Sequence, residues 1–275
     1  MADQFILFRL SLLPRPQVDF LSDYNASREE YLRKVFATEY KFEYWKVTYH
    51  YVPAKHDGRE ALLGRLGRHI TVEENLPPDK GLVDSVHEGW KAAVLVIDPR
   101  HHKDGQKLAF EYDKQVGEPL KLAARLAHTI NEANPHAPYS VEIAPIVDAE
   151  TFWEFERINE GNITLLSFEF VTPNMFGADD EITDELREFR DAEKARRVKV
   201  TLTNSDGLAT NTARVAHSVE YTSKSGGNIR ARARGNKHYN STQKTKSVIL
   251  RDDAPTKEPL LVRAARKISE ILGRE

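Results

Sequence analysis

The sequence predicts an α+β protein with mixed or antiparallel sheets and flanking helices. Strand-like segments rich in aromatic and β-branched residues recur along the chain of 275 residues, and helical patterns separate only some of them. An Asp-Gly pair at 104–105 lies between two strand-like runs, which indicates a hairpin and therefore antiparallel pairing. Residues 139–203 read as a β-α-β-α-β unit with short connections. The chain is long enough to bury a core in one large domain or two small ones.

The first 52 residues predict a strand, a helix and a second, longer strand. Residues 4–13 are short and apolar, as in a strand. Ser27 and Glu30 have the spacing of a capping box, which starts a helix ahead of residues 31–36. Residues 40–52 are dense in aromatic and β-branched side chains, so we expect one long strand. Its aromatic residues could form a platform on which bases stack, but we favour Trp45, Tyr49 and Tyr51 as core residues.

The middle of the chain contains the predicted hairpin. Glycine and proline interrupt residues 53–90, where we expect a short helix near 60–66 and a strand near 69–74. The runs 92–97 and 106–113 flank the Asp-Gly pair and would form the two strands of the hairpin.

The clearest helix begins near Pro119 and ends at Asn134-Pro135, with apolar residues at helical spacing between them. The stretch after it is the best candidate for a boundary. We therefore expect an N-terminal α+β segment, 1–135, and a C-terminal α+β segment with a basic strand, 136–275.

The C-terminal segment predicts alternating strands and helices. They are a strand at 139–147, a short helix capped by Asp148, a strand at 162–172, a charge-rich helix at 179–197, a strand at 199–203, a helical stretch at 208–217, strands at 228–234 and 246–250, and a final helix from Pro259 to Gly273. The helix at 179–197 starts acidic and ends basic, which suits the helix dipole.

Composition excludes several classes of protein. The chain has no cysteine, which excludes disulfides, thiol nucleophiles, iron–sulfur ligation and thiolate zinc sites, and fits the cytoplasmic location that we expect. No apolar run approaches the ~20 residues of a membrane span, so we expect no membrane insertion. Glycine-rich phosphate loops and nucleophile elbows are missing from the sequence, so we predict no cofactor and nominate no catalytic residue.

Charge is distributed unevenly, and this is the strongest functional signal. The chain has 40 basic and 42 acidic side chains, a net charge of −2. Residues 197–250 hold ten basic side chains and only two acidic ones, Asp206 and Glu220, so this segment is +8 and the remainder is −10. A basic surface on an acidic body is typical of a polyanion-binding protein.

Three arginines alternate with apolar residues inside this basic segment. A strand here would place their guanidinium groups on one face, about 7 Å apart, as phosphate ligands rather than base readers. The alternative is a solvated strand whose charges pair with the acidic helix at 179–188. We predict a nucleic-acid interface built from Arg230, Arg232, Arg234, Lys237, Lys244 and Lys246, with Lys224 and Arg214 in support.

Two other groups could hold a metal ion, although a structural role is the simpler interpretation of both. Asp98, His101, His102 and Asp104 cluster at the predicted hairpin tip, where polar residues are common in any case. Glu39-Tyr40-Lys41, with Asp19 or Asp23 upstream, has the local form of a nuclease motif but occurs readily by chance. We therefore predict no metal site.

The order of elements in the middle of the chain resembles the RexA-like phage-exclusion proteins and related accessory proteins of bacterial antiviral systems. The likeness covers residues 92–202. It consists of the strand and hairpin at 92–113, a helix, the strand Val141-Glu142-Ile143-Ala144-Pro145-Ile146 where the family has Val-x-Ile-x-Pro-Leu, a short aromatic helix, and Gly161-Asn162-Ile163-Thr164 leading a strand into Pro173-Asn174.

The resemblance implies an α+β homodimer that binds duplex DNA with little sequence preference. It further implies a role in phage defence as a sensor or regulator, together with a partner protein, and offers no catalytic residues to carry over. Three functions are therefore compared: a non-enzymatic DNA-binding protein, which we favour, a metal-dependent nuclease or toxin-like effector, and an interaction subunit that binds an acidic protein partner. In the third, the apolar stripe of the final helix (Leu261, Ala265, Ile268 and Leu272) would be a dimer seam instead of core.

Overall fold

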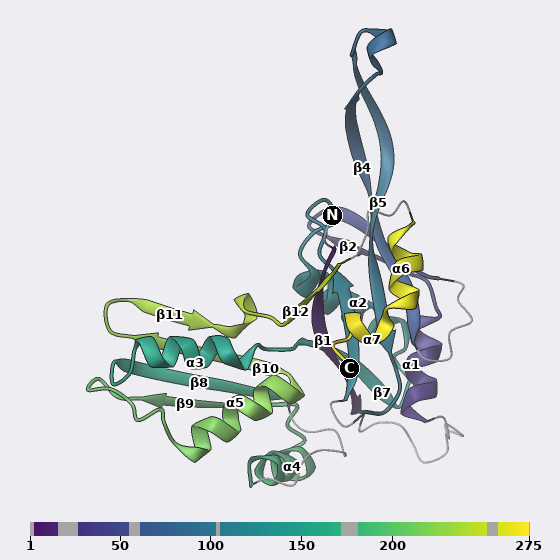
Figure 1. The fold of residues 1–275 in the computed structure, drawn as a ribbon. Coiled ribbons are helices and arrows are strands. Elements are labelled where there is room, and N and C mark those ends of the chain that lie inside the picture. Colours follow the sequence, from purple (N-terminus) through teal and green to yellow (C-terminus); the bar gives the residue numbers. More distant parts are fainter. Residues whose placement is uncertain are drawn as a thin grey trace.

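The computed structural model describes residues 3–15, 27–54, 61–102, 105–171, 181–251 and 258–274. This part of the chain confirms the α+β class, with strands that pair in two antiparallel sheets (Figure 1). The larger sheet has the order β12-β1-β6-β5-β4-β3-β2, and β7 also pairs with β1. Its strands are β1 Asp3–Pro14, β2 Tyr40–Tyr44, β3 Val47–Pro53, β4 Leu62–Asn75, β5 Asp84–Asp98, β6 Gln106–Glu111, β7 Tyr139–Pro145 and β12 Ser247–Leu250.

Helices cover both faces of the larger sheet because β1 alternates between two apolar cores. Phe8, Leu10 and Leu12 pack with α1 and α2, whereas Phe5 and Leu7 pack with α6 and α7. The helices are α1 Arg28–Phe36, α2 Pro119–Ala133, α6 Leu260–Arg266 and α7 Ile268–Ile271. The stripe of the predicted final helix is mostly core: Ile268 and Leu272 are buried and Ala265 packs beside them. That helix is divided in two at Lys267.

The smaller sheet has the order β11-β10-β8-β9 and one helical layer. Its elements are β8 Ile163–Val171, β9 Arg197–Thr203, β10 Gly227–Ala233 and β11 Lys237–Asn240, with helices α3 Ala149–Ile158, α4 Glu181–Glu193 and α5 Ala213–Ser225. Phe152 of α3 and Val219 of α5 pack on Leu166 and Phe168 of β8, so one face of the sheet is covered by helices. Two 3-10 turns complete the described elements, η1 Pro78–Lys80 and η2 Ser241–Gln243.

A two-stranded neck joins the two sheets. β12 and β7 lie end to end along one edge of β1. Between them, opposite Leu7, the chain after β7 and the chain before β12 lead away from β1. The Leu7 carbonyl accepts the N–H of Ile146 at 3.0 Å, and the Leu7 N–H donates to Lys246 at 2.9 Å. Residues 146–148 and 244–246 then run antiparallel, bridged at Val147 and Thr245. The smaller sheet and its helices are thus carried by two adjacent segments (Figure 1).

The predicted β-α-β-α-β order is present, but its strands do not form one sheet. β7 pairs with β1 in the larger sheet, whereas β8 and β9 pair with each other in the smaller one. The boundary expected after residue 135 stays a prediction, although β7 and β12, from its C-terminal side, pair with β1 from its N-terminal side.

Several elements were predicted correctly from residues that are close together in the chain. The capping box is formed, with the Ser27 N–H donating to Glu30 at 2.6 Å and the Glu30 N–H to Ser27 Oγ at 3.2 Å. The hairpin of β5 and β6 is confirmed, with Gly105 at a φ of 72°. Asp104, Asp179 and Asp180 lie outside the described residues.

Two predictions in the N-terminal part are wrong. Residues 40–52 form the β2–β3 hairpin, because the chain turns at Trp45 and Lys46, where φ is 50° and 62°. Of the expected helix at 60–66, residues 62–66 are instead the start of β4. Gly64 is required for packing there, since a Cβ would lie 2.6 Å from the ring of Tyr51.

In the C-terminal part, the helix expected at 208–217 forms a few residues later, as α5.

Candidate nucleic-acid interface

The alternation predicted for the arginine strand is present in β10. Ile229, Ala231 and Ala233 are buried against the helices, whereas Arg230 and Arg232 are exposed on the opposite face. Because side chains alternate across a strand, the two guanidinium groups lie on the same side of the sheet, about 7 Å apart along β10. This confirms the predicted orientation for two of the three arginines.

The neighbouring strands complete the surface around these two arginines. Arg230 lies between Asn240 of β11 and Ser167 of β8, and Arg232 lies between His238 and Leu165. On the far side of β8, Ser167 faces Thr201 and Glu169 faces Lys199. We call this surface the open sheet face and define it by Leu165, Ser167, Glu169, Arg197, Lys199, Thr201, Arg230, Arg232, His238 and Asn240.

Buried hydrogen bonds hold β10 in place at its first residues. Ser241 Oγ donates to the side-chain oxygen of Asn228 at 2.9 Å and accepts the N–H of Ile229 at 2.8 Å. Both Ser241 and Asn228 are buried, so η2 is fixed against the start of β10. The two arginines that follow are consequently presented from a rigid strand.

The open sheet face is positively charged because its one carboxylate is already neutralised. The Glu169 carboxylate binds Arg197 at 2.7 Å, and Arg197 also binds Glu142 of β7. Burial acts to lower the pKa of Arg197, but its bonds to these two glutamates outweigh burial and raise that pKa. Within the described residues Arg230, Arg232 and Lys199 form no ion pair, so three cations face solvent without a counter-charge.

Among the described residues, pairing with the acidic helix does not account for these charges. Of the predicted site residues, Arg214 is the one that binds a described residue of α4, Glu185, at 3.2 Å. Arg214 and Lys224 both lie on α5, in the helical layer on the other side of the sheet, and Lys224 binds Glu220 of its own helix. The basic residues of 197–250 therefore lie on both sides of the smaller sheet.

The remaining predicted residues lie at the margins of the open sheet face. The Arg234 guanidinium donates to the Ser205 carbonyl at 2.9 Å beyond the end of β10. Lys237 is exposed, but it pairs in register with Ala233 and so occupies a helix-side position. Lys244 and Lys246 are exposed residues of the neck. The eight residues thus do not form one continuous surface.

Sequence reasoning missed the contribution of β9. Lys199 and Thr201 are polar residues that alternate with Val198 and Val200. This alternation indicates that β9 has a polar face, but it does not indicate which strand lies next to β9. Ser167 and Thr201 have hydroxyl oxygens 3.1 Å apart across β8 and β9. Ser167 is buried and Thr201 is exposed, and an exposed hydroxyl beside cations is a typical phosphate ligand.

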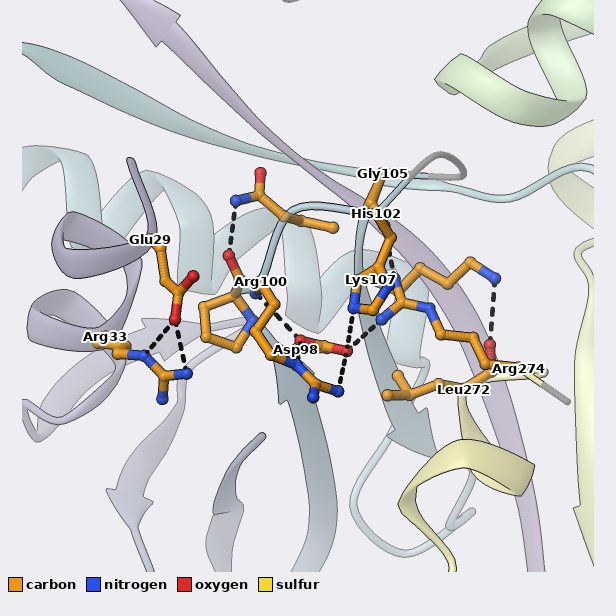
Figure 2. A network of polar contacts seen from close by, with 11 residues as sticks. Glu29, Arg33, Asp98, Arg100, His102, Gly105, Lys107, Leu272 and Arg274 are labelled. Atoms are coloured by element: carbon orange, nitrogen blue, oxygen red, sulfur yellow. Dashed lines mark hydrogen bonds and ion pairs between the residues drawn. The ribbon is translucent and has the colours of Figure 1, made fainter. Parts of the chain in front are cut away.

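The candidate metal residues at the hairpin are used in an ion-pair network (Figure 2). Asp98 is 0% exposed, and its carboxylate accepts the backbone N–H and Nε of Arg100 at 3.0 Å each. His102 Nε2 lies 3.0 Å from the same carboxylate, and Arg274 binds it from the C-terminal segment. Burial raises the pKa of Asp98, but the bonds to Arg100 and the charge of Arg274 outweigh it and hold that pKa below its ordinary value.

This network serves to anchor the C-terminal segment. Arg274 donates to the Gly105 carbonyl at 2.6 Å, and Lys107 Nζ donates to the Leu272 carbonyl at 3.2 Å (Figure 2). In the described parts of the chain, no group of three or more His, Cys, Asp or Glu residues could hold a metal ion. Glu39 and Lys41 are exposed at the start of β2, and Asp19 and Asp23 lie outside the described residues.

Comparison with known proteins found no matching family model, no similar curated protein and no similar solved structure. The RexA-like resemblance of residues 92–202 therefore stays a prediction. No helix in the described ranges is both long enough and apolar enough to cross a membrane.

Proposed function

We propose that the open sheet face binds the phosphate backbone of duplex DNA with little sequence preference. In this proposal the protein is a non-enzymatic sensor or regulator of bacterial antiphage defence, acts in the cytoplasm as a homodimer, and has a partner protein. The defence role, the dimer and the partner rest on the resemblance of residues 92–202. The DNA-binding surface rests on the observations that follow.

The observation that carries the proposal is the exposure of Arg230 and Arg232 on one face of β10 without an ion pair among the described residues. Lys199, two strands away, extends the positive charge across the sheet. A cation without a counter-charge in the protein is available to neutralise a DNA phosphate. Each neutralised phosphate releases counterions from the DNA, and this release favours binding.

The shape of the surface favours the backbone over base edges. It is formed by strands of a four-stranded sheet, and none of the described helices of the smaller sheet lies on it to enter a major groove. The arginine spacing of about 7 Å is roughly twice the 3.4 Å axial spacing of phosphates along one DNA strand. Contacts of this kind give affinity with little sequence information.

The test is fluorescence anisotropy of a labelled random-sequence duplex over a range of salt concentrations. The Arg230→Ala/Arg232→Ala variant should bind at least tenfold more weakly than wild type at low salt. The matched control, Arg214→Ala/Lys224→Ala, removes the same charge from the helical side of the same sheet and should bind within about threefold of wild type. Circular dichroism verifies the folding of each variant.

Absence of wild-type binding at low salt would contradict the proposal and leave the face to an acidic protein partner. Equal loss in the two double variants would show that net charge, and not the open sheet face, determines affinity. The nuclease alternative is tested in parallel, by incubating the labelled duplex with the protein and Mg²⁺ and measuring strand length on a denaturing gel. Cleavage that a chelator abolishes would favour it.

A further inference from the structure

The longest hairpin in the structure extends beyond the larger sheet as an isolated arm (Figure 1). β4 and β5 pair at every position from Leu62 with Ile97 to Asn75 with Asp84. β3 accompanies β4 only as far as Arg68, and β6 accompanies β5 only from Leu95. We define the arm as residues 69–90. Both of its outer backbone edges are unpaired within the described structure.

An isolated two-stranded ribbon in water is marginally stable, because it has no third strand or helix to cover its side chains. The arm exposes four large apolar residues, with Val86 64% and Trp90 63% exposed and Leu82 and Val83 more than half exposed. Exposed apolar side chains on an unsupported ribbon indicate a surface that is covered in a complex.

One face of the arm combines two of these apolar residues, Val86 and Trp90, with two acids, Glu73 and Glu88. The register places Glu73 opposite Val86, Thr71 opposite Glu88 and His69 opposite Trp90, so all six side chains lie on one face. Residues 69–90 contain five acidic side chains and one lysine, a net charge of −4 with neutral histidines. Two arms brought together would repel each other, so the charge favours a basic partner surface over a second arm.

The open sheet face has the complementary charge and the same repeat. Arg230, Arg232 and Lys199 are its cations without ion pairs among the described residues. Same-face residues recur about every 7 Å on both surfaces, because both are strands. Figure 1 shows the arm and the smaller sheet projecting from the larger sheet in different directions, so the arm does not lie on the sheet of its own chain.

We propose that the arm of one copy of this protein docks on the open sheet face of a second copy. Glu73 and Glu88 contact Arg230 and Arg232 of that copy, and Trp90 and Val86 are covered. Each copy offers one arm and one face, so two copies can dock reciprocally. The arm then occupies the surface proposed for DNA, and the two compete. The contact itself requires no DNA, so it stands or falls separately from the DNA binding proposed for the open sheet face.

The test is self-association measured by sedimentation equilibrium in low salt without DNA. A Glu73→Lys/Glu88→Lys arm variant and an Arg230→Glu/Arg232→Glu sheet variant should each associate at least tenfold more weakly than wild type, because their arms and faces carry like charges. An equimolar mixture of the two should associate like wild type, because each arm now meets a face of opposite charge. Recovery in the mixture also shows that both variants are folded.

A matched pair of single variants locates the contact on the arm. Glu88 lies 3.3 Å from His69 on the proposed contact face, and Glu74 lies 3.8 Å from His87 on the other face. Glu88→Lys should weaken self-association and Glu74→Lys should leave it unchanged. A wild-type protein that stays monomeric up to 100-micromolar concentrations (roughly the range in which weak contacts appear), or a mixture that does not recover association, would overturn the proposal.

Discussion

The carboxylate of Glu111 accepts the backbone N–H of Val94 at 2.7 Å, where β5 parts from β6 and runs on into the arm. Burial raises the pKa of Glu111 to about 7, with Asp113 and Asp3 adding to the shift, whereas the Val94 N–H and Lys91 oppose it. A side chain thus continues the strand pairing for one more residue at the base of the arm.

This arrangement predicts a specific dependence of stability on pH. The carboxyl pKa is raised from 4.5 to about 7 on folding, so its stabilising contribution is complete below pH 4.5 and is lost as pH rises through 7. Glu111→Gln should raise the free energy of unfolding by about 3 kcal/mol at pH 8 and leave it nearly unchanged at pH 4.5. Urea denaturation at both values checks this. Glu154→Gln, on the exposed side of α3, should show no such difference.

Asp98 should be critical to stability because its buried carboxylate is bound by Arg100 and Arg274 and also lies 3.0 Å from His102 (Figure 2). Asp98→Asn leaves the Arg100 and Arg274 guanidinium groups without a counter-charge and should cost about 3 kcal/mol in urea denaturation at neutral pH. Since the pKa of Asp98 is lowered on folding, its contribution is present at neutral pH and is lost as pH falls below 3.8. A cost under about 1 kcal/mol would contradict the importance assigned to this network.

A substitution of both residues in the β2–β3 turn should increase the stability of the protein. Trp45 and Lys46 both have positive φ, which is unfavourable for side chains with a Cβ, and Trp45 is 82% exposed. Asn-Gly suits such a turn, so Trp45→Asn/Lys46→Gly should stabilise the protein by about 1–2 kcal/mol. The urea midpoint should rise with an unchanged slope. Trp45→Ala/Lys46→Ala retains the backbone strain and should show no gain.

The salt dependence of DNA binding should distinguish two neighbouring cations of β9. Lys199 has no ion pair among the described residues, whereas Arg197 is bound by Glu169 and Glu142. If Lys199 contacts one phosphate, Lys199→Ala should reduce the slope of log K against log salt by about 0.9. Arg197→Ala should reduce it by less, since its charge is already neutralised. Equal slopes for the two variants would argue against the assigned roles.

Signals confined to a few neighbouring residues were sufficient for several elements and for part of the site. Ser27 and Glu30 start α1, Pro119 and Asn134 bound α2, and the alternation around Arg230 and Arg232 places both on one face of β10. The β2–β3 turn was missed because Trp45 and Lys46 carry none of the usual turn residues. The start of β4 was missed because Gly64 accommodates Tyr51, a residue of another strand.

The sequence by itself thus determined caps, helical stripes, strand faces and the location of excess positive charge, because each depends on residues that are close in the chain. Only the tertiary structure decided which strands are neighbours. In the structure, Lys199 lies two strands from Arg230, and Arg214 and Lys224 lie on the opposite side of the smaller sheet. β7 and β8 belong to different sheets. The physical reason is that alternation defines the faces of a strand, whereas its partners are chosen by pairing and packing across long separations in the chain.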